Sequence, residues 1–197
     1  MADAPKVGRR TWLKLGVAGG ALFAVGGGVA AWLSWGYDRK LGARDRPVSL
    51  SVKEFAVVRA VVSALLPGAD DLPPGNELGV AQRVDEELWA ASEKQRAQLK
   101  QGLQLLEHLP LAYGRASRFT ALDPDDAARL FTELVASDRD SVRQLALALK
   151  QLVHLEYYGD ERTWAAMRYD GPLGIARKPP ASHVAYARLV ARRGGRA

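Results

Sequence analysis

From residue 49 to residue 174, apolar side chains recur at the three- and four-residue spacing of an α-helix, and the alternation of a β-strand is scarce. The first helix is the clearest. Ser51 and Glu54 form a capping box, helical spacing continues to Leu66, and Pro67-Gly68 ends it. This pattern indicates an all-α fold, and we predict a compact bundle of about four to six helices over residues 49–174.

Start and stop signals divide the rest of this region. Pro110 is expected to interrupt the third helix, because a proline inside a helix has no N–H to donate. Gly159 is expected to end a later helix as its C′ residue. Val80, Val84 and Leu88 are expected on the buried side of a second helix, and further helix starts are expected at Ser92, Asp123-Pro124, and Ser137 or Asp138.

The basic charge of the chain is confined to its two ends. The whole chain carries 28 Lys/Arg against 22 Asp/Glu, for a net charge of +6. Residues 1–46 carry +5, residues 47–176 carry −5, and residues 177–197 carry +6. A nucleic-acid-binding domain carries positive charge on its folded body, so this distribution argues against a nucleic-acid partner.

The residue inventory also restricts the chemistry. The chain has no cysteine, which excludes disulfides, thiolate metal sites, iron–sulfur clusters and c-type haem attachment. The sequence contains no zinc-binding helix motif, nucleophile elbow or phosphate-binding glycine loop. We therefore expect no catalytic residue, no metal site and no cofactor in this chain.

The N-terminus has the layout of an export signal, with a basic start followed by an apolar stretch. Residues 15–37 carry no charge, and glycine is frequent among them. The start resembles the twin-arginine signal, with tryptophan in place of its usual phenylalanine and glycine in place of Ser/Thr. Four residues match the signal, and a fifth, Trp12, occupies its aromatic position. The matching residues are Arg9, Arg10, Leu13 and Lys14.

Two questions about this segment stay open. It could instead be an ordinary membrane anchor in which Arg9-Arg10 is only a positive flank. The signal could also be cleaved or retained, since 23 uncharged residues would span about 34 Å as a helix. We expect a periplasmic protein, anchored to the inner membrane by residues 15–37 if the segment is retained. The expected organisation is signal or anchor 1–37, linker 38–48, helical domain 49–174 and basic tail 175–197.

The most unusual stretch is residues 157–172, which we call the aromatic corner. It combines aromatic side chains with strong turn signals. Aromatics hold turns in place by burying large areas, and they are also enriched at binding interfaces, so a packed corner and a docking surface are both open. The candidate docking residues are Tyr157, Tyr158, Trp164, Tyr169, Asp170, Gly171 and Pro172.

The basic tail has two interpretations as well. Residues 182–193 could form a short amphipathic helix that lies on anionic lipid, or a frayed terminus.

Together these features resemble the gluconate 2-dehydrogenase subunit 3 family, over most of residues 8–174. The tail 175–197 is not covered. The most specific part of the resemblance is the pairing of Tyr-Tyr-Gly with Tyr-Asp-Gly-Pro. The matching elements are the twin-arginine-like start, Leu50-Ser51-x-x-Glu54, Leu65-Leu66-Pro67, Leu78-Gly79-Val80, Val84-Asp85, Tyr157-Tyr158-Gly159-Asp160, Trp164 and Tyr169-Asp170-Gly171-Pro172.

The resemblance implies a small subunit without a redox centre. Its partner would be a large flavoprotein of the glucose-methanol-choline type, which carries FAD and oxidises a sugar or another alcohol. A cytochrome c often receives the electrons in such complexes. The small subunit would assist maturation of the flavoprotein and its passage through the twin-arginine translocase. The alternatives are a membrane-anchored helical scaffold unrelated to oxidoreductases, and a stand-alone periplasmic enzyme with a hidden carboxylate or histidine site.

Overall fold

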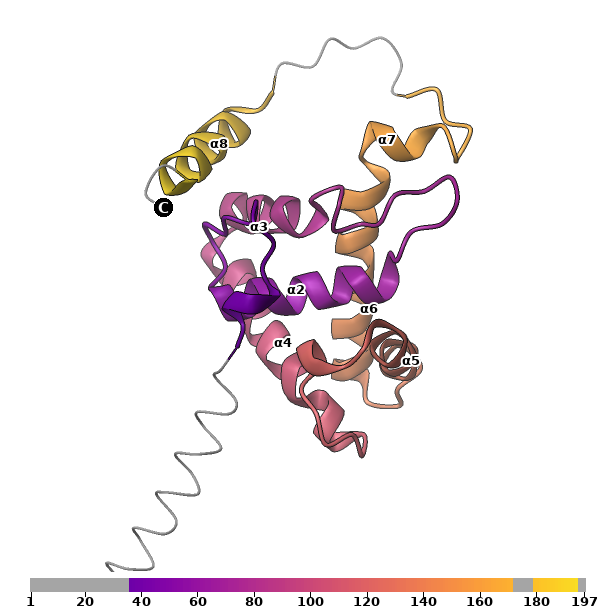
Figure 1. The fold of residues 1–197 in the computed structure, drawn as a ribbon. Coiled ribbons are helices and arrows are strands. Elements are labelled where there is room, and N and C mark those ends of the chain that lie inside the picture. Colours follow the sequence, from indigo (N-terminus) through magenta and orange to yellow (C-terminus); the bar gives the residue numbers. More distant parts are fainter. Residues whose placement is uncertain (1–35, 172–178, 195–197) are drawn as a thin grey trace, which may run out of the picture. The chain divides into compact units, whose positions relative to one another are not determined.

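The computed structural model describes residues 36–171 and 179–194 (Figure 1). These residues contain seven α-helices, two short 3₁₀ helices and no β-strand. Six of the seven α-helices lie within residues 49–174, so the predicted all-α class and helix number are confirmed. The expected signal helix lies outside the described residues. The elements are η1 (Asp38–Lys40), α2 (Val52–Leu65), α3 (Val80–Ala90), α4 (Glu93–Ala112), η2 (Phe119–Ala121), α5 (Pro124–Val135), α6 (Asp140–Tyr158), α7 (Glu161–Trp164) and α8 (Ala181–Gly194).

Helix α2 is the centre of the core. It contacts α3, α4, α5 and α6. Seven of its apolar side chains are buried, on almost every side of the helix, as expected for a helix that is enclosed by others. The capping box predicted at its start is present, because the Ser51 hydroxyl accepts from the Glu54 amide and Glu54 accepts from the Ser51 amide. Helices α5 and α6 then pack against each other and against α2.

One predicted helix end was wrong, and at a second, Gly159, the position was right but the backbone geometry was not. Pro110 does not interrupt α4, which continues to Ala112. Pro110 lies in the last turn, where its missing N–H removes a single helical bond and its ring is buried in the core. Gly114, with a φ of 73°, follows the true end.

Gly159 is not a left-handed C′ residue. It is the C-cap of α6 in right-handed geometry, because α7 begins two residues later and the chain must turn tightly. The start of α6 was also placed two or three residues too early, since the helix begins at Asp140.

A buried carboxylate on α3 holds the entry into the helical domain. The Asp85 side chain is fully buried. Its two oxygens accept hydrogen bonds from the backbone amides of three consecutive residues, Val48 (2.6 Å), Ser49 (3.0 Å) and Leu50 (2.6 Å). The Tyr186 hydroxyl on α8 donates a fourth bond at 2.7 Å. Charged hydrogen bonds of this kind offset the cost of removing a carboxylate from water.

The segment before α2, which contains the stretch expected as a linker, lies against the helices. The Tyr37 hydroxyl donates to the fully buried Glu107 at 2.7 Å, and Thr120 donates to the same carboxylate through its amide and its hydroxyl. Burial and the bond to Glu107 raise the pKa of Tyr37 to about 12, so its hydroxyl remains a donor. Asp45 pairs with Arg59 of α2 at 2.6 Å.

The tail forms a helix, α8, that contacts α3. Its Tyr186 is 3% exposed and sits 6.1 Å from the Trp89 ring. Burial and the neighbouring Asp85 carboxylate raise the pKa of Tyr186. Within residues 36–171 and 179–194, none of the helices combines the length and the apolar character needed to cross a bilayer.

Replacing Asp85 with asparagine should lower the free energy of unfolding by about 2–3 kcal/mol. An amide oxygen is a weaker acceptor than a carboxylate, and the new NH₂ group would face N–H donors. Urea denaturation followed by circular dichroism measures the change. Tyr186→Phe removes one donor only, so it should cost about 1 kcal/mol. Equal stability of Asp85→Asn and the unmodified chain would show that this carboxylate does not hold the entry segment.

Candidate functional site at the aromatic corner

The end of α6 and the short helix α7 form a tight turn organised by Asp160. The Asp160 carboxylate accepts from the Arg162 amide, which caps α7. The buried Thr163 hydroxyl donates to the Asp160 carbonyl at 2.8 Å. An aspartate at the N-cap and a threonine that bonds the backbone three residues before it both act over a few residues. This part of the turn therefore follows from the local sequence alone.

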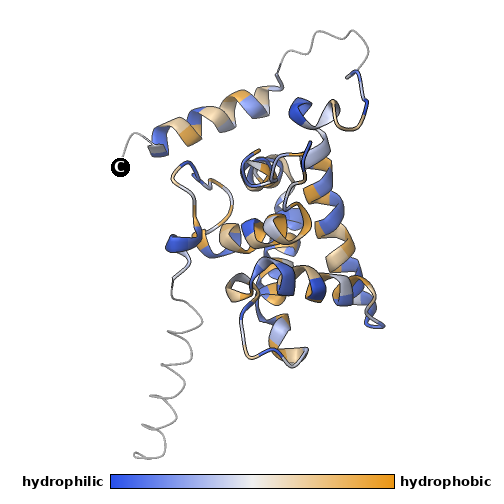
Figure 2. Ribbon diagram, turned by 45° about the vertical axis from the view of Figure 1, so that its right-hand side comes forward, coloured by the Kyte–Doolittle hydropathy of each residue, from blue (hydrophilic) through white to orange (hydrophobic). Residues whose placement is uncertain are grey.

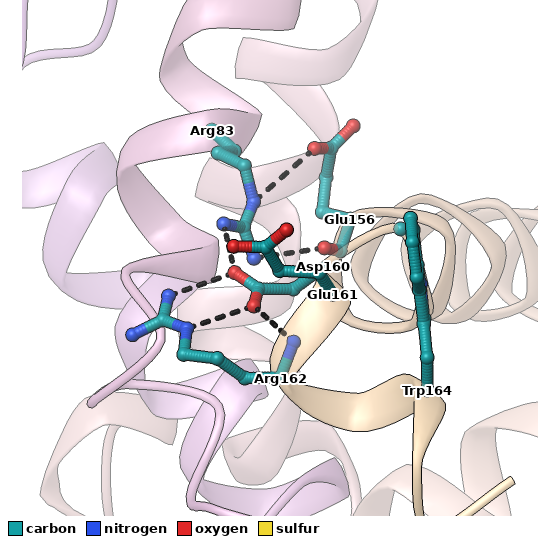
Figure 3. Close-up of a pocket in the computed structure, with 7 residues that line it drawn as sticks. Arg83, Glu156, Asp160, Glu161, Arg162 and Trp164 are labelled. Atoms are coloured by element: carbon teal, nitrogen blue, oxygen red, sulfur yellow. Dashed lines mark hydrogen bonds and ion pairs between the residues drawn. The ribbon is translucent and has the colours of Figure 1, made fainter. Parts of the chain in front are cut away.

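A polar pocket of about 490 Å³ opens on one side of this turn. Arg83 of α3 donates to Asp160 at 2.7 Å and to the Glu156 carbonyl at 2.9 Å. Arg162 binds both oxygens of Asp160 and reaches the Leu78 carbonyl. Figure 3 shows the two guanidinium groups converging on Asp160, with Trp164 standing apart from this cluster. The lining residues are Arg83, Glu156, Gly159, Asp160, Glu161, Arg162 and Trp164.

Two of the three carboxylates that line this pocket have pKa values shifted in opposite directions. Hydrogen bonds from Arg162 and then Arg83 lower the pKa of Asp160, so its carboxylate is ionised at neutral pH. Burial raises the pKa of Glu156 to about 7, and the neighbouring Glu87 carboxylate adds to the rise. The Arg83 side chain, 3.6 Å from the Glu156 carboxylate, does not offset the cost of that burial. Asp160 is therefore charged at neutral pH, whereas Glu156 titrates near neutral pH.

The aromatic side chains of the corner divide into buried and exposed ones. Tyr157 is 2% exposed and donates to the Pro73 carbonyl at 2.8 Å, so it belongs to the core. Trp164 donates its indole N–H to the Tyr158 carbonyl and meets the Tyr169 ring edge-to-face at 5.3 Å. Tyr158 and Tyr169 are 38% and 46% exposed. The packed-corner interpretation is therefore confirmed for Tyr157, whereas docking through the exposed Tyr158 and Tyr169 stays a prediction.

Gly171 closes the corner over Trp164. Its φ is +90°, and a Cβ at this position would lie 2.7 Å from the Trp164 ring. Glycine is thus required both by the backbone conformation and by the close approach of the indole. Asp170 is exposed, and Pro172 lies outside the described residues.

An apolar groove of about 560 Å³ opens beside the polar pocket. Trp164 and Gly159 line both, so the indole separates a charged surface from an apolar one. Leu155, in the wall of the groove, is 69% exposed, the most exposed large apolar side chain among the described residues. The lining residues are Gln151, His154, Leu155, Tyr158, Gly159, Trp164 and Tyr169.

The structure brings Tyr157, Tyr158, Trp164 and Tyr169 together, as the sequence pattern indicated. The predicted export residues Arg9, Arg10, Trp12, Leu13 and Lys14 lie outside the described residues. Sequence reasoning did not find the ion-pair cluster, because Arg83 comes from α3, 73 residues before Glu156, and nothing around it marks it. His154 and Glu156 lie two residues apart on α6, and they line the groove and the pocket respectively.

The described residues offer no group of three or more His, Asp or Glu side chains that could hold a metal ion. His154 contacts the Lys150 carbonyl on its own helix, and His183 contacts Glu86 at 2.5 Å. His108 lies beside Lys53, and burial lowers its pKa. The chemistry that the corner does offer is a contact surface, apolar on one side of Trp164 and charged on the other.

Glu156 should make stability depend on pH. Its folded pKa of about 7 lies above the ordinary value of 4.5, so the folded state keeps a proton that the unfolded state has lost between these values. The contribution is complete below pH 4.5 and is lost as the pH rises to about 7. Glu156→Gln should therefore gain stability over the unmodified chain across this window, on the order of 2 kcal/mol at pH 8. Urea denaturation at a series of pH values tests this, and parallel curves for the two proteins would refute it.

Comparison with curated proteins and with solved structures finds no match to this chain. A family model described as gluconate 2-dehydrogenase subunit 3 matches residues 52–171. The matched region starts at α2 and ends at Gly171, so it contains the core, the polar pocket and the apolar groove, and it stops before α8. It covers more than half of the sequence, and the chain therefore belongs to the gluconate 2-dehydrogenase subunit 3 family.

Proposed function

We propose that this chain is the non-catalytic small subunit of an exported, flavin-dependent dehydrogenase that oxidises a sugar or another alcohol. Its role is to bind the large flavoprotein subunit, to assist its maturation and to accompany it through the twin-arginine translocase. Membership of a family named as a subunit of gluconate 2-dehydrogenase supports the association with a dehydrogenase. FAD belongs to the large subunit in this proposal, and a cytochrome c is a further partner that would receive the electrons.

The observation that carries the proposal is the exposed apolar surface of the aromatic corner. Leu155, Tyr158, Met167 and Tyr169 are between 38% and 69% exposed within a short stretch of chain. Clustered exposed side chains of this type mark binding surfaces, and aromatic anchors contribute most of the binding energy there. Because the surface lies inside the region matched by the family model, we assign it to the large subunit that the family name implies.

The polar pocket supports the same assignment. Arg83 and Arg162 hold Asp160, and through it they fix the direction in which α7 leaves α6. Trp164, Tyr158 and Tyr169 are thereby presented on a rigid turn before any partner binds. A preorganised surface loses less conformational entropy on association than a flexible one.

The basic start of the chain supports the route of export. A twin-arginine translocase carries folded proteins, and a flavoprotein that receives FAD in the cytoplasm must cross in a folded state. Arg9 and Arg10 would then serve both subunits, provided that the complex forms before export. The chain remains at the membrane in this proposal when residues 15–37 are retained.

Leu155→Ser should weaken co-purification of the large subunit by tenfold or more, since loss of an interface anchor costs about 1–2 kcal/mol or more. The side chain is 69% exposed, so the substitution should leave the helical domain folded. Leu105→Ser is the matched control, because Leu105 is also an exposed leucine, at 48%, and lies on α4 away from the groove. Equal recovery of the flavoprotein with both variants would place the interface elsewhere.

Replacement of Arg9-Arg10 by Lys-Lys should retain both this chain and the flavoprotein in the cytoplasm, because the translocase recognises the arginine pair. Fractionation followed by immunoblotting of both subunits measures the effect. The positive charge is unchanged, so a simple membrane anchor would tolerate the replacement. Normal export of the flavoprotein in this variant would exclude a shared signal.

A further inference from the structure

Helix α8 docks onto α3 through one face. The Tyr186 hydroxyl donates to the Asp85 carboxylate and meets the Gln82 side chain at 2.5 Å. The Gln82 amide also pairs with the backbone N–H and C=O of Arg46, at 3.0 Å each. One glutamine on α3 thus joins the C-terminal helix to the segment that precedes the domain.

The end of α8 makes a second contact with that segment. Arg193, seven residues after Tyr186 and so on the same face of the helix, donates to the Pro47 carbonyl. Residues 46–50 are thereby bound by α8 directly at Pro47 and indirectly through Gln82 and Asp85 of α3, and Pro47 and Arg193 meet although they are 146 residues apart in sequence.

The opposite face of α8 is free and basic. Arg188 and Arg192 are four residues apart, which places them one turn above each other on a helix, and both are exposed. Neither lies on the face of Tyr186 that docks onto α3. Figure 2 shows hydrophilic and hydrophobic positions interleaved along α8, as expected for a helix with two different faces.

The segment that precedes α2 is basic as well. Arg39, Lys40 and Arg44 are exposed, and they come just before Pro47. Residues 37–50 and 181–194 together contain seven Lys/Arg and two Asp, whereas residues 51–171 contain 14 Lys/Arg and 19 Asp/Glu. The fold therefore collects positive charge from both ends of the chain beside an acidic helical body. Two acidic side chains near this region already have basic partners, because Asp45 pairs with Arg59 and Glu86 pairs with His183.

We propose that the outer face of α8, together with the exposed basic residues of the segment 39–46, binds anionic phospholipid headgroups. The choice of a membrane over an acidic protein rests on sequence position, since the uncharged residues 15–37 end two residues before Arg39. Basic residues next to such a segment lie at headgroup depth when it enters a bilayer. The proposal rests on the membrane location proposed above and not on binding of the flavoprotein. Helix α8 lies beyond the residues that the family model matches.

The test measures partitioning of the purified full chain into two kinds of vesicle, phosphatidylcholine alone and phosphatidylcholine mixed with phosphatidylglycerol. The ratio of the two partition coefficients isolates headgroup attraction from insertion of residues 15–37. Arg188→Gln/Arg192→Gln should lower this ratio about 30-fold, because each basic residue at an anionic surface contributes about fivefold. Lys94→Gln/Lys150→Gln removes the same charge from exposed sites on α4 and α6 and should leave the ratio nearly unchanged.

A second measurement reports location directly. The chain has no cysteine, so Ala187→Cys on the exposed face of α8 takes a single polarity-sensitive fluorophore, and Gln144→Cys on α6 is the control position. Emission of the α8 label alone should shift to the blue on anionic vesicles, and high salt should reverse the shift. Equal ratios for the two double variants, or equal shifts at both labels, would overturn the proposal. A shift that occurs only after the flavoprotein is added would assign the surface to a protein partner and would also overturn it.

If the membrane location itself were wrong, binding of the chain to phosphatidylcholine vesicles would be absent, while the difference between the two double variants on the anionic vesicles would still report the basic surface. The two failures are therefore distinguishable. No flavoprotein is needed in the partitioning experiment, so its outcome is independent of the docking surface at the aromatic corner.

Discussion

The arrangement of this domain depends on the Asp85 carboxylate, a full negative charge buried on α3. Such a group is stable only where several donors surround it, and here three consecutive backbone amides and a tyrosine hydroxyl do so. The donors come from both ends of the described chain. The same interaction therefore sets where the chain enters α2 and where α8 docks. The fully buried Glu107 has a comparable role, since it holds Tyr37 and Thr120.

The aromatic corner is built on the same principle at smaller scale. Asp160 accepts bonds from Arg83 and Arg162, and this fixes the turn between α6 and α7. The turn presents Trp164 with an apolar groove on one side and a charged pocket on the other. A two-sided surface of this kind fits the proposed role of binding a partner subunit. The second surface, around α8, has a different chemistry and so suits a different partner.

Much of the fold was predictable from local signals, and the failures have local causes too. The capping box at Ser51 and the aspartate cap of α5 act over three residues, so the sequence shows them directly. The expected helix break at Pro110 and the expected left-handed geometry at Gly159 were wrong. The effect of each residue depends on its position within a turn, which the spacing of apolar residues does not reveal. In the candidate site, the aromatic residues were recognisable from composition. Arg83 and the shifted pKa of Glu156 were not, because both arise from packing of α3 against the end of α6.

The sequence by itself determined the helical class, most helix starts, the separation of basic ends from an acidic body, and the family resemblance that the family model confirms. Helical periodicity, capping and net charge are properties of neighbouring residues, so they need no three-dimensional information. Only the tertiary structure decided which aromatics of the corner are core and which are surface, and whether the tail frays or docks. Those outcomes depend on partners 84 to 146 residues away, such as Pro73 for Tyr157 and Pro47 for Arg193. A buried polar group selects its partners by geometry after the chain has collapsed, and sequence spacing carries no record of that choice.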